Sequence, residues 1–161
     1  MTGTVAETGP ERTKILVLLD GSTWSHKCAL HAVQVAKKSG SMVVFLSVLD
    51  RSEARAQAFI FCAQSDMCHL IRDHEEKIWR DMKRSINTEY QDLLTYYAKE
   101  KVDCESRTVE GDVREEVLKE ANSGRYSLVV MGAYGKSGKS HAGMLSEQIA
   151  GLVDPPLLIV R

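Results

Sequence analysis

The sequence lacks several features that would at once assign it to a broad class. No stretch approaches the roughly 18 consecutive apolar residues of a membrane-spanning helix. Its 21 basic and 22 acidic side chains leave a formal net charge of −1. Proteins that coat nucleic acids carry a large basic excess instead. Prolines number only 3, and hydrophobic residues make up 43% of the 161 residues, which argues against wholesale disorder. We therefore expect one globular domain without a nucleic-acid or membrane partner.

The first residues and the cysteines indicate the compartment. The segment MTGTVAETGPERTK has no apolar core of a secretory signal. We expect residues 1–13 to form a flexible tail ahead of a single domain over 14–161. The four cysteines form no CxxC pair, and we expect them to stay reduced. These features predict a cytoplasmic protein.

Apolar runs alternate with helical patterns along the chain. Continuous apolar runs predict buried strands, alternating residues predict a half-exposed strand, and a strand led by two prolines favours a sheet edge. The expected strands cover residues 14–20, 42–50, 102–109, 127–132 and 157–161. Apolar stripes with helical spacing lie between them, at residues 23–39, 70–98, 112–123 and 145–152.

Local signals set the expected helix ends. Ser22 and Asp112 have side chains suited to N-caps, and Gly40 and Gly124 are expected to end the helices before them. Residues 51–70 show no clear pattern and are expected to be an irregular insertion or loop.

The helical stripe over residues 70–98 is unusually long. A continuous helix there would run about 43 Å, longer than a small domain. We expect either a break or an overhang near Asn87 and Thr88.

Strands that alternate with helices predict an α/β fold. Parallel pairing and right-handed crossovers give an open, doubly wound five-stranded parallel sheet with helices on both faces. Placing the half-exposed and proline-led strands outside gives the order 3-2-1-4-5. Ligands bind such sheets beyond the carboxyl ends of the strands, where the order reverses. That position brings Asp20, Gly21 and Ser22 beside Met131 and Gly132.

A glycine-rich loop follows the strand at 127–132. Residues 132–143 contain four glycines and two lysines, and a helix follows them. Backbone N–H groups, lysine charge and a helix N-terminus together favour a phosphate cradle. The alternative is a solvated loop whose glycines only make turns.

The same loop also resembles a nucleotide-hydrolase P-loop. In that interpretation Lys139 would contact phosphates and Ser140 would bind the metal. Ala133 stands where the first glycine belongs, and no later strand supplies a metal-binding acid. The spacing of serine, histidine and aspartate residues does not indicate a catalytic nucleophile. We therefore expect ATP hydrolysis to be slow if it occurs at all.

Several segments together resemble the universal stress protein family. They are KILVLLDGS, VVFLSVLD, VEGDVREEVLKEA and SLVVMGAYGKSG with GMLSEQIAGLVDPPLLIVR. The resemblance covers about residues 14–50 and 102–161, and it implies the sheet order argued above. It also implies ATP or another adenine nucleotide as cofactor, with or without Mg²⁺, a regulatory role in stress response, and a homodimer formed through the last strand.

The resemblance implies which residues hold the nucleotide. Asp20 and the Val48 backbone would hold the adenosine end, and the loop from 135 to 145 would take the phosphates. The full set of cofactor-binding candidates is Leu19, Asp20, Val48, Met131, Gly132, Gly135, Lys136, Gly138, Lys139, Gly143, Met144 and Leu145.

The chain departs from the family pattern in this loop. Only seven residues separate Gly135 from Gly143 instead of nine, and Met144 replaces the usual Ser or Thr. Methionine cannot donate a hydrogen bond to a phosphate. A nucleotide-independent dimeric interaction protein of the same fold is therefore the alternative function.

A second cluster lies within the unassigned region. Cys62, Cys68, His69 and His74 are residue types that bind zinc, although their spacing matches no familiar zinc motif. Pairing of Cys62 with Cys68 under oxidation is a further alternative. Buried cysteines and solvated histidines, with no metal, are the simpler interpretation.

Overall fold

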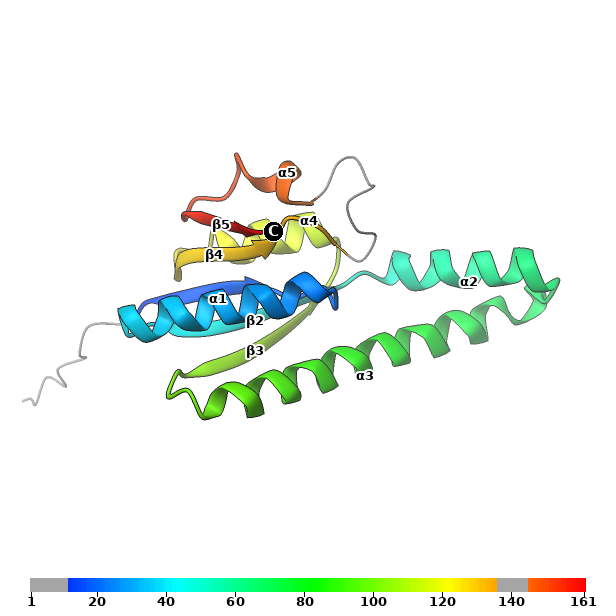
Figure 1. Ribbon diagram of the computed structural model, residues 1–161. Coiled ribbons are helices and arrows are strands. Elements are labelled where there is room, and N and C mark those ends of the chain that lie inside the picture. Colours follow the sequence, from blue (N-terminus) through cyan, green and yellow to red (C-terminus); the bar gives the residue numbers. More distant parts are fainter. Residues whose placement is uncertain (1–11, 136–144) are drawn as a thin grey trace, which may run out of the picture.

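The computed structural model describes residues 12–135 and 145–161. Within these residues the chain forms a parallel sheet with the strand order β3-β2-β1-β4-β5 (Figure 1). The strands are β1 (Lys14–Leu18), β2 (Met42–Leu49), β3 (Cys104–Glu110), β4 (Tyr126–Gly132) and β5 (Leu157–Val160). The predicted sheet order is confirmed, with the half-exposed and proline-led strands at the two edges.

Helices cover both faces because successive residues of a buried strand point to opposite sides of the sheet. Ile15 and Val17 belong to the core under α1 (Thr23–Ser39) and α3 (Ile71–Ala98). Leu16 and Leu18 belong to the core under α4 (Val113–Ala121) and α5 (Leu145–Ile149). The predicted arrangement with helices on both faces is therefore confirmed.

The ends of the elements follow the sequence signals in part. Gly40 ends α1 with a left-handed φ of 69°, and the Asp112 carboxylate accepts a hydrogen bond from the Glu115 N–H at 2.9 Å. In contrast, α4 ends at Ala121, three residues before Gly124. The Thr13 carbonyl, directly before β1, accepts a hydrogen bond from the Met42 N–H at 2.9 Å, while residues 1–11 of the expected tail lie outside the described residues.

The region expected to be irregular is mostly helical, so that prediction is wrong. Helix α2 (Arg51–Ser65) is followed by a short 3₁₀ turn, η1 (Cys68–Leu70). Ala54, Ala58 and Cys62 recur every four residues and are buried. The stripe was missed because two of the three large apolar side chains of this helix, Phe59 and Ile60, lie on its exposed surface instead.

Helix α3 is continuous over 28 residues, so the expected break near Asn87 does not occur. The chain accommodates its length by an overhang instead. Helices α2 and α3 pack as a hairpin that extends beyond the strands (Figure 1). The overhang lies at the start of α3, since Ile86 and Tyr90, which flank Asn87, belong to the core of the domain.

Contacts near both ends of the hairpin hold α2 against the segment that follows it. The Arg51 guanidinium donates to Glu75 at 3.0 Å and pairs with Glu76, while it lies 5.0 Å from the centre of the Trp79 ring. At the far end a disulfide joins Cys62 to Cys68. The expectation that all cysteines are reduced is wrong for this pair, since the turn between α2 and η1 brings their Cα atoms within 4.5 Å.

Candidate functional site

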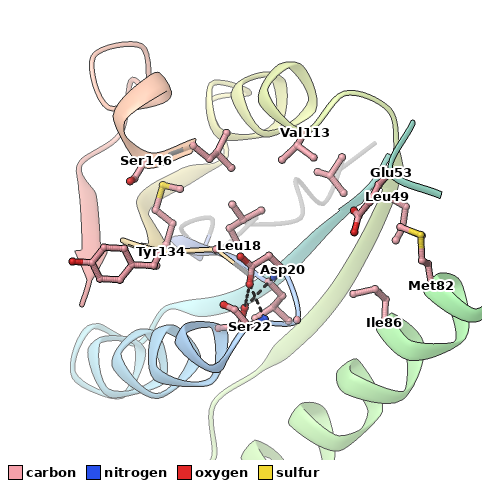
Figure 2. Close-up of a pocket in the computed structure, with 18 of the residues that line it drawn as sticks. Leu18, Asp20, Ser22, Leu49, Glu53, Met82, Ile86, Val113, Tyr134 and Ser146 are labelled. Carbon is pink, nitrogen blue, oxygen red and sulfur yellow. Dashed lines mark hydrogen bonds between the residues drawn. The ribbon is translucent and has the colours of Figure 1, made fainter. Parts of the chain in front are cut away.

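A cavity of about 480 Å³ lies beyond the carboxyl ends of β1 and β4, where the strand order reverses. Its lining comes from the ends of β1, β2 and β4 and from α2, α3, α4 and α5. Figure 2 shows Asp20 and Ser22 between two ends, one with Tyr134 and Ser146 and the other with Glu53, Leu49 and Met82. The volume is within the usual range for small-molecule sites.

The Asp20 carboxylate is held in one orientation. Its Oδ1 atom accepts hydrogen bonds from the Ser22 N–H at 2.9 Å and the Ser25 hydroxyl at 2.8 Å. These bonds position the start of α1, and Gly21 permits the turn with a φ of 79°. The second oxygen, Oδ2, lies on the Gly135 side of the cavity. Asp20 can therefore hold the turn before α1 with one oxygen and accept a ligand hydrogen bond with the other.

The glycines at the end of β4 allow close packing beside Asp20. A Cβ atom on Gly132 would lie 2.9 Å from the Trp24 Cβ and 3.2 Å from the Tyr134 carbonyl oxygen. A Cβ atom on Gly135 would lie 3.4 Å from Asp20 Oδ2. The Trp24 and Tyr134 rings pack edge to face with centroids 5.2 Å apart. Gly132 is thus required by packing, while Gly135 leaves access to Asp20.

The predicted cofactor-binding residues fall into two groups. Seven of them line the cavity: Leu19, Asp20, Val48, Met131, Gly132, Gly135 and Leu145. The other five, Lys136, Gly138, Lys139, Gly143 and Met144, lie outside the described residues. The near P-loop, including Lys139 and Ser140, is outside them as well. The sequence thus correctly predicted that these seven residues lie together at the carboxyl ends of the strands. Their role in binding a ligand stays a prediction.

Ser22 also lines the cavity, and it does not cap α1 as expected. Its side chain makes no capping hydrogen bond, and the Ser25 N–H donates to the Ser22 carbonyl oxygen at 3.1 Å instead. The residue is only 8% exposed, and its buried Oγ atom has no hydrogen-bond partner among the described residues. A buried hydroxyl without a partner is costly. This atom is therefore the group of the described lining that most needs a hydrogen-bond partner.

Other lining residues come from the hairpin, which sequence patterns did not assign to the site. They are Glu53 from α2 and Met82, Ser85 and Ile86 from α3. One signal was available for α2, because Asp50 and Glu53 have the spacing of an N-cap and its third helical residue. The structure confirms that cap, since Asp50 accepts from the Ser52 N–H at 2.8 Å. For α3, only tertiary packing could show which turn faces the cavity.

Acidic side chains dominate the charge of the described lining. Asp20 and Glu53 are carboxylates, and no lysine, arginine or histidine lines the cavity within residues 12–135 and 145–161. Ten apolar side chains form most of the remaining wall: Leu18, Leu19, Val48, Leu49, Met82, Ile86, Val113, Met131, Ala133 and Leu145. This combination suits the uncharged and flat part of a ligand, with hydrogen-bond donors directed at the carboxylates.

The two unpaired cysteines are not poised as nucleophiles. Burial, with the nearby negative charge of Asp20 as a smaller cause, raises the pKa of Cys28 to about 12. Burial, followed by the charge of Asp103, raises the pKa of Cys104 to about 11. Both therefore stay protonated thiols at neutral pH, and neither lines the cavity.

The zinc hypothesis for the second cluster is wrong for the described residues. Cys62 and Cys68 are joined to each other, and the His74 ring stacks on Phe61 with centroids 3.9 Å apart. In the part of the chain that the structure describes, no three histidine, cysteine or acidic side chains are grouped to hold a metal ion. The oxidised pairing, kept as an alternative from the sequence, is the arrangement found.

Within the described ranges, no helix combines the length and apolar character needed to cross a membrane. This agrees with the absence of a long apolar run in the sequence. The 28 residues of α3 are long enough, but its surface is strongly charged.

Comparison with known proteins supports the same family that the motifs suggested. The model of the universal stress protein family matches residues 11–161. The universal stress protein YxiE of Bacillus subtilis is 26% identical over 150 residues, covering 92% of this chain and 98% of its own length. The match therefore includes the hairpin region, for which sequence motifs carried no resemblance.

Solved structures show the same fold. The hypothetical protein MJ0577 superposes with a TM-score of 0.73 at 18% identity, covering 93% of this chain and 96% of its own. A universal stress protein in complex with cAMP gives a TM-score of 0.56 at 18% identity, with coverages of 94% and 98%. An Archaeoglobus fulgidus universal stress protein in complex with dAMP gives 0.55 at 13% identity, with coverages of 94% and 99%.

Proposed function

Because the chain belongs to the universal stress protein family, we propose that it is a regulatory protein that binds an adenine nucleotide in the cavity beyond β1 and β4. Two proteins of the same fold are described in complex with cAMP and dAMP. The observation that carries the proposal is the buried Ser22 hydroxyl, which lines the cavity beside Asp20 without a partner. A ligand hydroxyl or phosphate oxygen would satisfy it.

The chemistry of the lining supports a direction for the nucleotide. Its phosphates would lie at the glycine end, where Gly132 and Gly135 line the cavity and where the sequence continues into Lys136 and Lys139. Asp20 would accept hydrogen bonds from the ribose through Oδ2. The base would lie among the apolar side chains at the opposite end, including Val48, as the family resemblance implies.

Replacing Ser22 by alanine tests the proposal most directly. We expect Ser22→Ala to weaken binding of AMP and ATP about fivefold, since about 1 kcal/mol of hydrogen bonding is lost. Stability should not fall, because no protein hydrogen bond to Oγ is removed. Isothermal titration calorimetry with and without Mg²⁺ measures the affinity, and urea unfolding measures the stability.

Ser106→Ala is the matched control, because Ser106 is an exposed serine of β3 that does not line the cavity. It should leave both affinity and stability unchanged. If the unaltered protein binds no adenine nucleotide at millimolar concentration, and none is released when freshly purified protein is denatured, the proposal is wrong. The nucleotide-independent interaction protein would then be the function to pursue.

We further propose that two copies pair through β5. This edge strand exposes Leu158 and Ile159, at 36% and 40%, beside the unpaired hydrogen-bonding edge of the sheet. Edge strands with apolar side chains favour pairing with another chain. A two-fold axis through this edge would satisfy both copies at once. The pairing is compatible with nucleotide binding and with the alternative function alike.

A further inference from the structure

The end of the cavity away from Gly135 carries a carboxylate. At one end the chain continues from Gly135 into a segment that contains Lys136, Lys139 and His141. At the other end Glu53 is the charged residue among the described lining, and Figure 2 shows it with Leu49 and Met82, across the cavity from Tyr134. A phosphate is repelled from the end that holds the Glu53 carboxylate.

The position of Glu53 follows from the start of α2. Asp50 caps this helix, its carbonyl accepts from the Glu53 N–H at 3.1 Å, and Glu53 therefore lies in the first helical turn. That turn directly follows β2, which is paired with β1, so Glu53 reaches the same edge of the sheet as Asp20. Its carboxylate points toward the cavity in Figure 2. The Gln57 amide contacts its Oε1 atom at 3.4 Å.

The walls around Glu53 suit an aromatic ring. Leu49 is the last residue of β2. Met82 and Ile86 approach from α3 and Val113 from α4 (Figure 2). An apolar slot lined by flexible and branched side chains accepts a flat base. A carboxylate at its rim accepts hydrogen bonds and donates none, so it selects a base edge that carries N–H groups.

We propose that Glu53 is a specificity-determining residue that accepts a hydrogen bond from the exocyclic amino group of the bound purine. This inference rests on the proposed nucleotide function and adds the basis of its selectivity. The amino group of adenine is such a donor, whereas the unsubstituted purine lacks it. Glu53 thereby distinguishes 6-aminopurines from purines without the amine. Contacts to the phosphates add affinity that does not depend on the identity of the base.

Calorimetry with adenosine and purine riboside isolates this contact, because the two nucleosides differ only in the amino group and carry no phosphate. We expect the unaltered protein to bind adenosine about tenfold more tightly than purine riboside. Glu53→Ala should abolish this preference by weakening adenosine alone. Glu53→Gln should keep part of it, since the amide oxygen is still an acceptor.

Glu147→Ala controls for the loss of one negative charge near the cavity, because Glu147 is exposed on α5 and does not line the cavity. It should keep the full preference for adenosine. The inference is overturned if adenosine is not preferred, or if Glu53→Ala weakens both nucleosides equally. If the unaltered protein binds neither nucleosides nor adenine nucleotides, the proposed function fails and this inference fails with it.

Discussion

Gly132 leaves no room for a side chain at the end of β4. The Trp24 Cβ atom and the Tyr134 carbonyl oxygen crowd the position that a Cβ atom would take. Both neighbours are constrained, because Trp24 belongs to the first turn of α1 and its ring packs on Tyr134. The absence of a side chain at this residue therefore holds the glycine-rich segment close to α1 and shapes the cavity.

We expect Gly132→Ala to destabilise the protein by about 1–3 kcal/mol, because a backbone or Trp24 shift must relieve the overlap. Urea unfolding followed by circular dichroism measures the change. Gly151→Ala is the matched control, since a Cβ atom there meets nothing within 4 Å. Equal stability of the two variants would contradict this account of Gly132.

Single residues also show how far the site could be predicted. Asp20 and Met131 were located because the carboxyl ends of parallel strands meet at one edge. The prediction that Ser22 caps α1 was wrong, because its residue type suits a cap but only the side-chain orientation decides whether the capping hydrogen bond forms. Glu53 was not considered at all, since its helix was not expected.

At the scale of elements, the α2–α3 hairpin is the main departure from expectation. Its inner stripe uses the small residues Ala54 and Ala58, which carry weak hydrophobic signals but let two helices approach closely. Its outer surface carries Phe59 and Ile60, with exposed fractions of 64% and 54%. A pattern based on large apolar residues therefore points away from the real interface.

The disulfide between Cys62 and Cys68 should be detectable and should stabilise the hairpin. Denatured without reductant, the protein should take up two alkylating groups, at Cys28 and Cys104, and after reduction four. Closing so short a loop stabilises by about 2 kcal/mol at most, so Cys62→Ser should lower the unfolding temperature modestly. Intact mass and differential scanning calorimetry measure the two effects.

Cys104→Ser serves as the control for this prediction, because Cys104 is unpaired and lies on β3. Reductant should still lower the unfolding temperature of the Cys104→Ser variant, because its disulfide is intact. Reductant should not change the unfolding temperature of the Cys62→Ser variant. Four alkylated cysteines before reduction would show that the bond does not form in solution. The hairpin would then depend on helix packing and on the Arg51 contacts alone.

At the scale of the whole molecule, the sheet leaves two edges that differ in character. At the β3 edge the exposed residues are polar or charged, with the sequence CESRTVE. The β5 edge exposes Leu158 and Ile159. Charged edges resist pairing and apolar edges favour it, so the second edge is the natural place for a two-fold contact.

We expect light scattering to give a mass twice the 17.9 kDa of one chain for the unaltered protein. Ile159→Lys should return it to the mass of a single chain, because a charge would be buried without a partner in the contact. Phe59→Lys is the control, since Phe59 is equally apolar and more exposed but lies on the hairpin. If the dimer persists in Ile159→Lys and dissociates in Phe59→Lys, the interface lies on the hairpin and not on β5.

The sequence by itself determined the sheet, its strand order and the edge at which a ligand would bind. These follow from local information, because apolar runs, helical stripes and the right-handed crossover rule act within neighbouring segments. Only the tertiary structure decided that residues 51–65 form a helix, that Cys62 meets Cys68, and that α2 and α3 complete the cavity. Those features depend on small residues buried between two helices, whose four-residue repeat carries only a weak hydrophobic signal. They also depend on side-chain orientations, which leave no signal in the chain.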